Sequence, residues 1–175
     1  MKILKIEMLG ILFISAFGSL LHFTFNWLNR FWLAGTFSAV NESTWEHLKL
    51  AVVASIIWAI LESKVFKVKA PNFLFAKFVS IYLAPILIAL FFYSYKAILG
   101  HNLLAIDISI FVLAVIISQI VSYKIMVLPE KFQKLKITSF ALLGLLLIAF
   151  VIFTFYPPHF FLFRDSVSGG YGIIK

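Results

Sequence analysis

Long apolar runs, separated by short polar segments, dominate the chain, and five of them are long enough to cross a membrane. A spanning helix needs about 20 apolar residues to traverse a hydrocarbon core of about 30 Å. The pattern therefore predicts an all-α fold, a polytopic membrane bundle of about five transmembrane helices. The expected spans are residues 6–28, 44–63, 72–99, 103–123 and 137–156.

Local signals support several of these limits. Ser43 and Glu46 have the capping-box spacing at the head of the second run. Pro85 lies near the middle of the third run and predicts a kink. A Pro-Pro pair ends the fifth run and leaves an outer tail over residues 157–175. Because no internal repeat or soluble domain is visible, we expect a single transmembrane domain over residues 1–175.

The composition excludes an ordinary soluble domain. Hydrophobic residues make up 63% of the 175 residues and charged residues 13%, whereas soluble domains average about 45–50% and about 25%. A soluble protein of this size would expose larger apolar patches than soluble monomers tolerate. The chain has no cysteine, which excludes disulfides, thiolate metal sites, Fe–S clusters and cysteine nucleophiles.

The net charge of +8 is unevenly distributed. Nine lysines lie at the N-terminus and in loops 64–71 and 124–136, against four or five basic residues on the other side. Cytoplasmic loops are rich in Lys and Arg, so we expect the N-terminus inside and the C-terminus outside. This bias accounts for the net charge of +8, so the charge does not require that the protein bind nucleic acid. The expected partners are membrane lipids and a cytoplasmic partner docked on the two basic loops.

Titratable side chains collect at the outer ends of the predicted spans, where all four histidines and four of the seven acids lie. His22, His47 and Asp107 lie deeper than a surface position requires. Ionisable groups inside a membrane cost free energy, face the bundle interior and pair with one another. We therefore expect these three side chains to converge on one outward-opening cavity, with Asn26 and Glu46 beside them.

Imidazole and carboxylate groups are suitable ligands for a divalent metal such as zinc. The predicted metal ligands are His22, His47, Asp107 and His159, and the predicted catalytic carboxylates are Glu46 and Asp107. The structural alternatives are a helix-capping role for Glu46 and an interhelical hydrogen-bond network for the others.

The tail provides further candidates. The Pro-Pro pair turns the chain back, and the apolar run 160–163 favours the membrane interface, so we expect the tail to cover or border the cavity. The predicted substrate-binding residues are polar positions of the outer face: Asn26, Asn41, Glu42, Arg164, Asp165 and Tyr171.

The sequence contains no phosphate loop, Rossmann glycine pattern, HExxH motif or Gly-x-Ser-x-Gly elbow. One hypothesis is a metal-assisted hydrolase, in which a metal-activated water attacks a lipid-like substrate. The alternatives are a transporter or substrate-capture subunit for a small solute, and a structural membrane assembly factor. The sequence leaves all three open.

Five short strings at the outer face carry a resemblance: HFTFNW at 22–27, NESTWEHLK at 41–49, PPH at 157–159, RD at 164–165 and GYG at 170–172. They resemble those of an uncharacterised family of small bacterial five-span membrane proteins, which implies a multi-pass protein of the bacterial cell (inner) membrane and supports the same outer-face residues. A second likeness, to membrane-embedded zinc hydrolases of the alkaline ceramidase type, rests on scattered His, Asp and Ser. The His-x-x-x-His pair of that type is missing.

Overall fold

The computed structural model describes residues 2–173, and it is a bundle of five long helices. The five are α1 (Lys2–Trp27), α2 (Thr44–Lys64), α3 (Phe73–Leu99), α4 (Leu104–Met126) and α5 (Lys136–Phe155), with short 3₁₀ turns η1 (Trp32–Thr36), η2 (Gln133–Leu135) and η3 (Phe161–Phe163) between or after them. Each long helix is apolar and long enough to cross a membrane. The predicted all-α, five-span architecture is confirmed.

The helix limits follow local chemistry. α1 begins earlier than predicted, at Lys2, and α3 continues through Pro85 as one helix. At the start of α2 the Ser43 hydroxyl accepts a hydrogen bond from the backbone N–H of Glu46, at 3.4 Å. α3 ends at Gly100, whose φ of 78° lies in the left-handed region that favours glycine.

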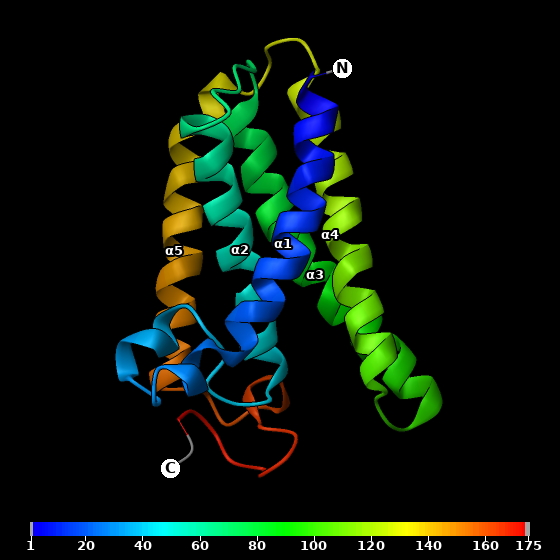
Figure 1. Ribbon diagram of the computed structural model, residues 1–175, viewed down its shortest axis with the longest axis vertical. Coiled ribbons are helices and arrows are strands. Elements are labelled where there is room, and N and C mark those ends of the chain that lie inside the picture. Colours follow the sequence, from blue (N-terminus) through cyan, green and yellow to red (C-terminus); the bar gives the residue numbers. More distant parts are fainter. Residues whose placement is uncertain (1, 174–175) are drawn as a thin grey trace.

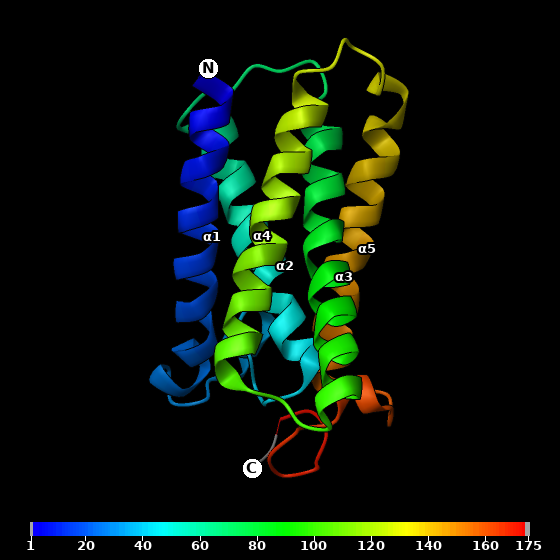
Figure 2. The same ribbon diagram turned by 90° about the vertical axis from the view of Figure 1, so that its right-hand side faces the viewer.

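The helices lie side by side and leave their loops at two ends (Figure 1). The start of α1 and the two basic loops lie at one end, and loop 28–43, the α3–α4 turn and the tail lie at the other. α1 packs against α2 and α4, and α3 packs against α2, α4 and α5 (Figure 2). In the most apolar stretch of α2 50% of the residues are buried, against 17% for α5. α2 is therefore the helix whose side chains are most enclosed by the others.

A glycine lets α1 approach its neighbours closely. A Cβ atom on Gly10 would lie 2.3 Å from Trp58 Nε1 and 2.4 Å from Gln119 Nε2. Small residues at such positions allow membrane helices to pack backbone to side chain. Gly144 of α5, by contrast, has nothing within 4 Å of the place where a Cβ would lie.

This difference predicts opposite effects of the same substitution. Gly10→Ala should lower the free energy of unfolding by about 1–3 kcal/mol because the added methyl group overpacks the contact with Trp58. Gly144→Ala should leave stability unchanged or raise it by up to about 1 kcal/mol, because alanine is the better helix former. Thermal unfolding of both variants in detergent checks this, and equal effects would contradict the packing described here.

Candidate metal centre

Two imidazoles and one carboxylate meet at the end of the bundle that carries the tail. Nε2 of His22 lies 3.2 Å from Nε2 of His47, and each of these nitrogens lies 3.4 Å from Oε2 of Glu42. All three potential ligand atoms lie within 4.8 Å of one another. The side chains of His22, His47 and Glu42 are 27%, 36% and 44% exposed, so the group opens to the outside of the bundle.

The path of the chain explains why these residues meet. His22 lies near the end of α1, and Asn29 and Arg30 follow the helix with φ of 51° and 58°. The loop that they begin returns the chain to α1, so that Glu42 and the first turn of α2 lie beside His22. Asparagine adopts left-handed φ more readily than most residues because its short side chain bonds locally.

His47 is held in one orientation by the backbone. Its Nδ1 lies 2.8 Å from the carbonyl oxygen of Ser43, the N-cap residue of α2. A neutral imidazole that donates from Nδ1 presents a lone pair at Nε2, whereas the protonated ring also donates from Nε2, which here faces Glu42. Second partners of this kind orient the imidazole ligands of metal sites. His22 is held by ring packing instead, with its ring centroid 5.1 Å from that of His47; its Nδ1 is buried and makes no hydrogen bond within residues 2–173.

The tail positions Glu42. Oδ1 of Asp165 accepts a hydrogen bond from the backbone N–H of Glu42 at 2.9 Å. The hydroxyl of Ser166 donates to the carbonyl oxygen of Glu42 at 3.1 Å, and the side-chain amide of Asn41 donates to the carbonyl oxygen of Gly172 at 2.8 Å. The tail therefore borders the site and fixes the backbone on both sides of Glu42.

Both acids at this contact are stabilised in the ionised form. Hydrogen bonds from His22 and then His47 hold the pKa of the Glu42 carboxyl well below its ordinary range. Burial favours the neutral acid at Asp165, but hydrogen bonds from Ser168 and from the backbone N–H of Glu42 outweigh it and lower its pKa. The ionised Glu42 stabilises the fold at pH values above the ordinary glutamate pKa of about 4.3, and this contribution is lost as the pH falls through the lower native value.

Glu46 points away from the imidazoles into a buried ion pair. Its Oε2 accepts from Lys49 Nζ at 2.6 Å, and Lys49 Nζ also donates to the carbonyl oxygen of Gly35 and to the hydroxyl of Thr154. That hydroxyl donates to Glu46 Oε1 at 2.8 Å, and the backbone N–H of Val40 donates to Oε2 at 3.1 Å. Glu46 and Lys49 are 1% and 0% exposed. Their pair joins α2 to α5 and to the loop before α2, so the structure places the predicted catalytic carboxylate of Glu46 in this pair.

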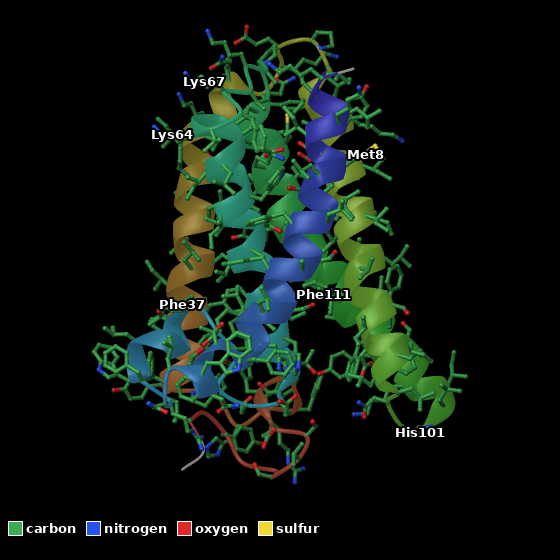
Figure 3. The ribbon with its side chains drawn as sticks, viewed as in Figure 1. Met8, Phe37, Lys64, Lys67, His101 and Phe111 are labelled. Atoms are coloured by element: carbon green, nitrogen blue, oxygen red, sulfur yellow. The ribbon has the colours of Figure 1, made fainter. Side chains whose placement is uncertain are left out.

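Asp107 also lies outside the group of His22, Glu42 and His47. Its carboxylate accepts hydrogen bonds from the hydroxyl of Tyr95 and, at 3.1 Å, from the side-chain amide of Asn102. These bonds close the α3–α4 turn, which extends away from loop 28–43 (Figure 1) and carries His101 at its tip (Figure 3). The carboxylate is satisfied locally, and the structure does not bring it to the imidazoles.

The other predicted site residues lie around the group without joining it. His159 stacks on Tyr171 with ring centroids 4.5 Å apart. Asn26 is exposed at the end of α1. Arg164 donates from Nε to the carbonyl oxygen of Gly169 within the tail. Within residues 2–173, the group of ligand atoms consists of His22, Glu42 and His47.

The chain matches one protein family over residues 1–173, described as "Family of unknown function (DUF6512)". The chain belongs to this family. The predicted resemblance to a family of unknown function is thereby confirmed, and the five helices agree with it. No curated protein and no solved structure matches the chain.

One ionic group was not predicted from the sequence. Glu7, Glu62 and Lys77 meet in the interior at the opposite end of the bundle. The detectable signal was the presence of two acids within apolar helical segments, because such residues seldom occur there without a partner.

The Glu46–Lys49 pair predicts a strong dependence on each partner. Glu46→Gln or Lys49→Met should each lower the free energy of unfolding by about 3–5 kcal/mol, because either change leaves an uncompensated buried charge. The double variant should lose less than the sum of the two. Unfolding of the wild type, the two single variants and the double variant in detergent measures the coupling between the two residues. Glu130→Gln, which changes an exposed acid, is the matched control and should change stability by no more than about 0.5 kcal/mol. Additive losses would argue against a direct pair.

Proposed function

We propose that this protein binds one divalent transition-metal ion of the zinc class through His22, Glu42 and His47, and that the site hydrolyses an ester of a lipid-like substrate. The observation that carries the proposal is the convergence of two imidazole nitrogens and one carboxylate oxygen, at 3.2 and 3.4 Å. These are the ligand types that zinc and similar ions favour.

The surroundings of the three residues support a metal ligand role. Ser43 orients His47 through Nδ1, and Asp165 orients Glu42 through its backbone. Outer partners of this kind are typical of metal sites, where their loss reduces affinity by about 10–100-fold. Glu42 is ionised at neutral pH because its pKa is held low, so it can ligate without first losing a proton.

The position of the group supports a substrate at the membrane surface. α2 has 21 residues, which at about 1.5 Å per residue corresponds to about 32 Å, close to the hydrocarbon thickness of about 30 Å. His47 lies in its first turn, so the group lies near the level of the lipid headgroups. Phe160 and Phe161 of the tail are 53% and 58% exposed, which favours contact with lipid beside the site.

The chemistry that suits such a site is hydrolysis. Three protein ligands leave a position for water, and a bound zinc-type ion lowers the pKa of that water to about 7. One water then splits one ester into an acid and an alcohol. In this proposal His22, Glu42 and His47 hold the ion, and Asp165 is a positioning residue. Glu46 and Asp107 have no part in the reaction, since each is already paired elsewhere.

The direct test measures metal content and ester hydrolysis on the same preparation. Purified protein loaded with zinc and dialysed should retain about one ion per chain, since residues 2–173 offer one group of three ligands. It should hydrolyse short-chain fluorogenic lipid esters in mixed micelles. His22→Ala, Glu42→Ala and His47→Ala should each abolish both properties.

Matched controls separate this site from the others that the sequence suggested. His159→Ala and Asp107→Asn should retain the metal, because neither residue belongs to the group. Loss of metal in these variants but not in His22→Ala would refute the assignment. Stoichiometric metal without any hydrolysis would leave a metal-binding protein and refute the hydrolase.

The pH dependence of metal binding should follow the imidazoles. Histidine ligates as the neutral ring, so affinity should fall as the pH drops and the imidazoles take up protons. Glu42 should not contribute in this range because its pKa lies lower. Isothermal titration at several pH values measures this. An affinity that falls only below about pH 4.3, the ordinary Glu pKa, would contradict the imidazole assignment.

The tail should affect the zinc affinity of the site without contributing a ligand. Asp165→Ala removes the acceptor for the Glu42 N–H and should weaken zinc binding by about 10–100-fold, as for other outer partners. Arg164→Ala, which loses a bond only within the tail, is the neighbouring control and should leave affinity close to that of the wild type. Unchanged affinity in Asp165→Ala would show that the tail does not position Glu42.

A further inference from the structure

A second buried ionic group lies in the opposite half of the bundle. Lys77 Nζ of α3 donates to Glu7 Oε1 of α1 at 2.6 Å and forms an ion pair with Glu62 of α2. Glu7, Glu62 and Lys77 are 1%, 0% and 2% exposed. Met8 and Lys64, labelled in Figure 3, mark the level of the group, because they follow Glu7 by one residue and Glu62 by two.

The charges in this group do not balance. Two carboxylates face one ammonium, so the fully ionised group carries a charge of −1. α4 contributes only the neutral hydroxyl of Ser122, which donates to Glu7 Oε1 at 3.2 Å. Within residues 2–173, the remaining lysines at this end are exposed, and Glu7 and Glu62 both form their ion pair with Lys77. In this part of the chain, no other buried cation at this end compensates the second carboxylate.

The Glu46–Lys49 pair at the other end of the bundle differs in its net charge. Glu46 and Lys49 are equally buried, but there one carboxylate faces one ammonium and the charges cancel. Carboxylates that share one site in a poorly polarisable interior cannot both remain ionised cheaply, and one of them holds a proton instead. By this rule the balanced pair needs no proton, whereas the group of three needs one.

Unpaired polar atoms provide an independent indication. Glu7 Oε2 and Glu62 Oε1 are buried and make no hydrogen bond within the described chain. Trp58 Nε1 and Gln119 Nε2 are buried donors in the same situation, and both lie against Gly10, one helical turn from Glu7. Buried polar atoms are normally satisfied. The exceptions need an explanation, and a proton on one of the two carboxyl groups provides one for Glu7 and Glu62.

We propose that Glu7, Glu62 and Lys77 form a proton-binding site that holds one exchangeable proton, shared between the two carboxyl groups. The ligand is the proton and not a metal cation, because Lys77 already occupies the space between the carboxylates with a positive charge. Binding of the proton makes the group neutral, and its release restores a buried negative charge. The bundle thereby has a titratable element that is separate from the metal site and independent of it.

Infrared difference spectroscopy tests this on the full-length protein in detergent. Wild-type protein at neutral pH should show the C=O stretch of a protonated carboxylic acid, shifted in D₂O, because exposed carboxyls are ionised there. Glu7→Gln and Glu62→Gln should each abolish the band, because each leaves one carboxylate and one ammonium in balance. Glu130→Gln, which changes an exposed acid, is the control and should retain it.

A stability measurement gives a second readout. The folded wild type holds a proton that the unfolded chain releases at neutral pH, so its melting temperature should fall as the pH rises through the range in which the group gives up that proton. Glu62→Gln and Glu7→Gln should be folded and should lose this dependence. Absence of the acid band in the wild type, or a band that both single variants retain, would overturn the proposal. If one variant does not fold, the other decides the result.

Discussion

The burial of charge in an apolar bundle is the constraint on which the rest of this structure depends. Hydrocarbon offers no water, so each ionised side chain must find its partner inside the protein or lie at an end. α2 carries more of the buried charged side chains than any other helix. It contributes Glu46 and Lys49 at one end and Glu62 at the other, all at most 1% exposed. α1, α3 and α5 supply the partners, and this arrangement explains why α2 is the most enclosed helix.

The Glu46–Lys49 ion pair also supports the proposed metal centre. Glu46 and Lys49 connect the start of α2 to α5 and to Gly35 and Val40 in the preceding loop. The same loop ends in Glu42, and the same first turn carries His47. A structural ion pair thus holds the scaffold from which two of the three proposed ligands project. Asp165 completes the support from the tail, which is why we assign positioning, and not chemistry, to the buried acids of this end.

The sequence predicted the fold well because apolar length and turn signals act locally. It also predicted that His22 and His47 converge, since both lie toward the same end of the bundle. It did not single out Glu42 as a ligand, because Glu42 reaches the imidazoles through the return of loop 28–43 and the bond to Asp165, more than a hundred residues away. Asp107 was expected at the site because depth alone does not reveal a local partner such as Tyr95. The sequence did not reveal Glu7 as a buried ion-pair partner, because it follows two lysines at the start of the chain.

X-ray absorption at the metal edge tests the central claim most directly. The account predicts that zinc-loaded protein shows two imidazole rings in the first shell, with nitrogen at about 2.0–2.1 Å, together with oxygen ligands from a carboxylate and water. His22→Ala should lose the imidazole scattering of one ring if any metal remains. A first shell of oxygen only, or no metal retained by the wild type, would contradict the assignment of His22, Glu42 and His47 as one site.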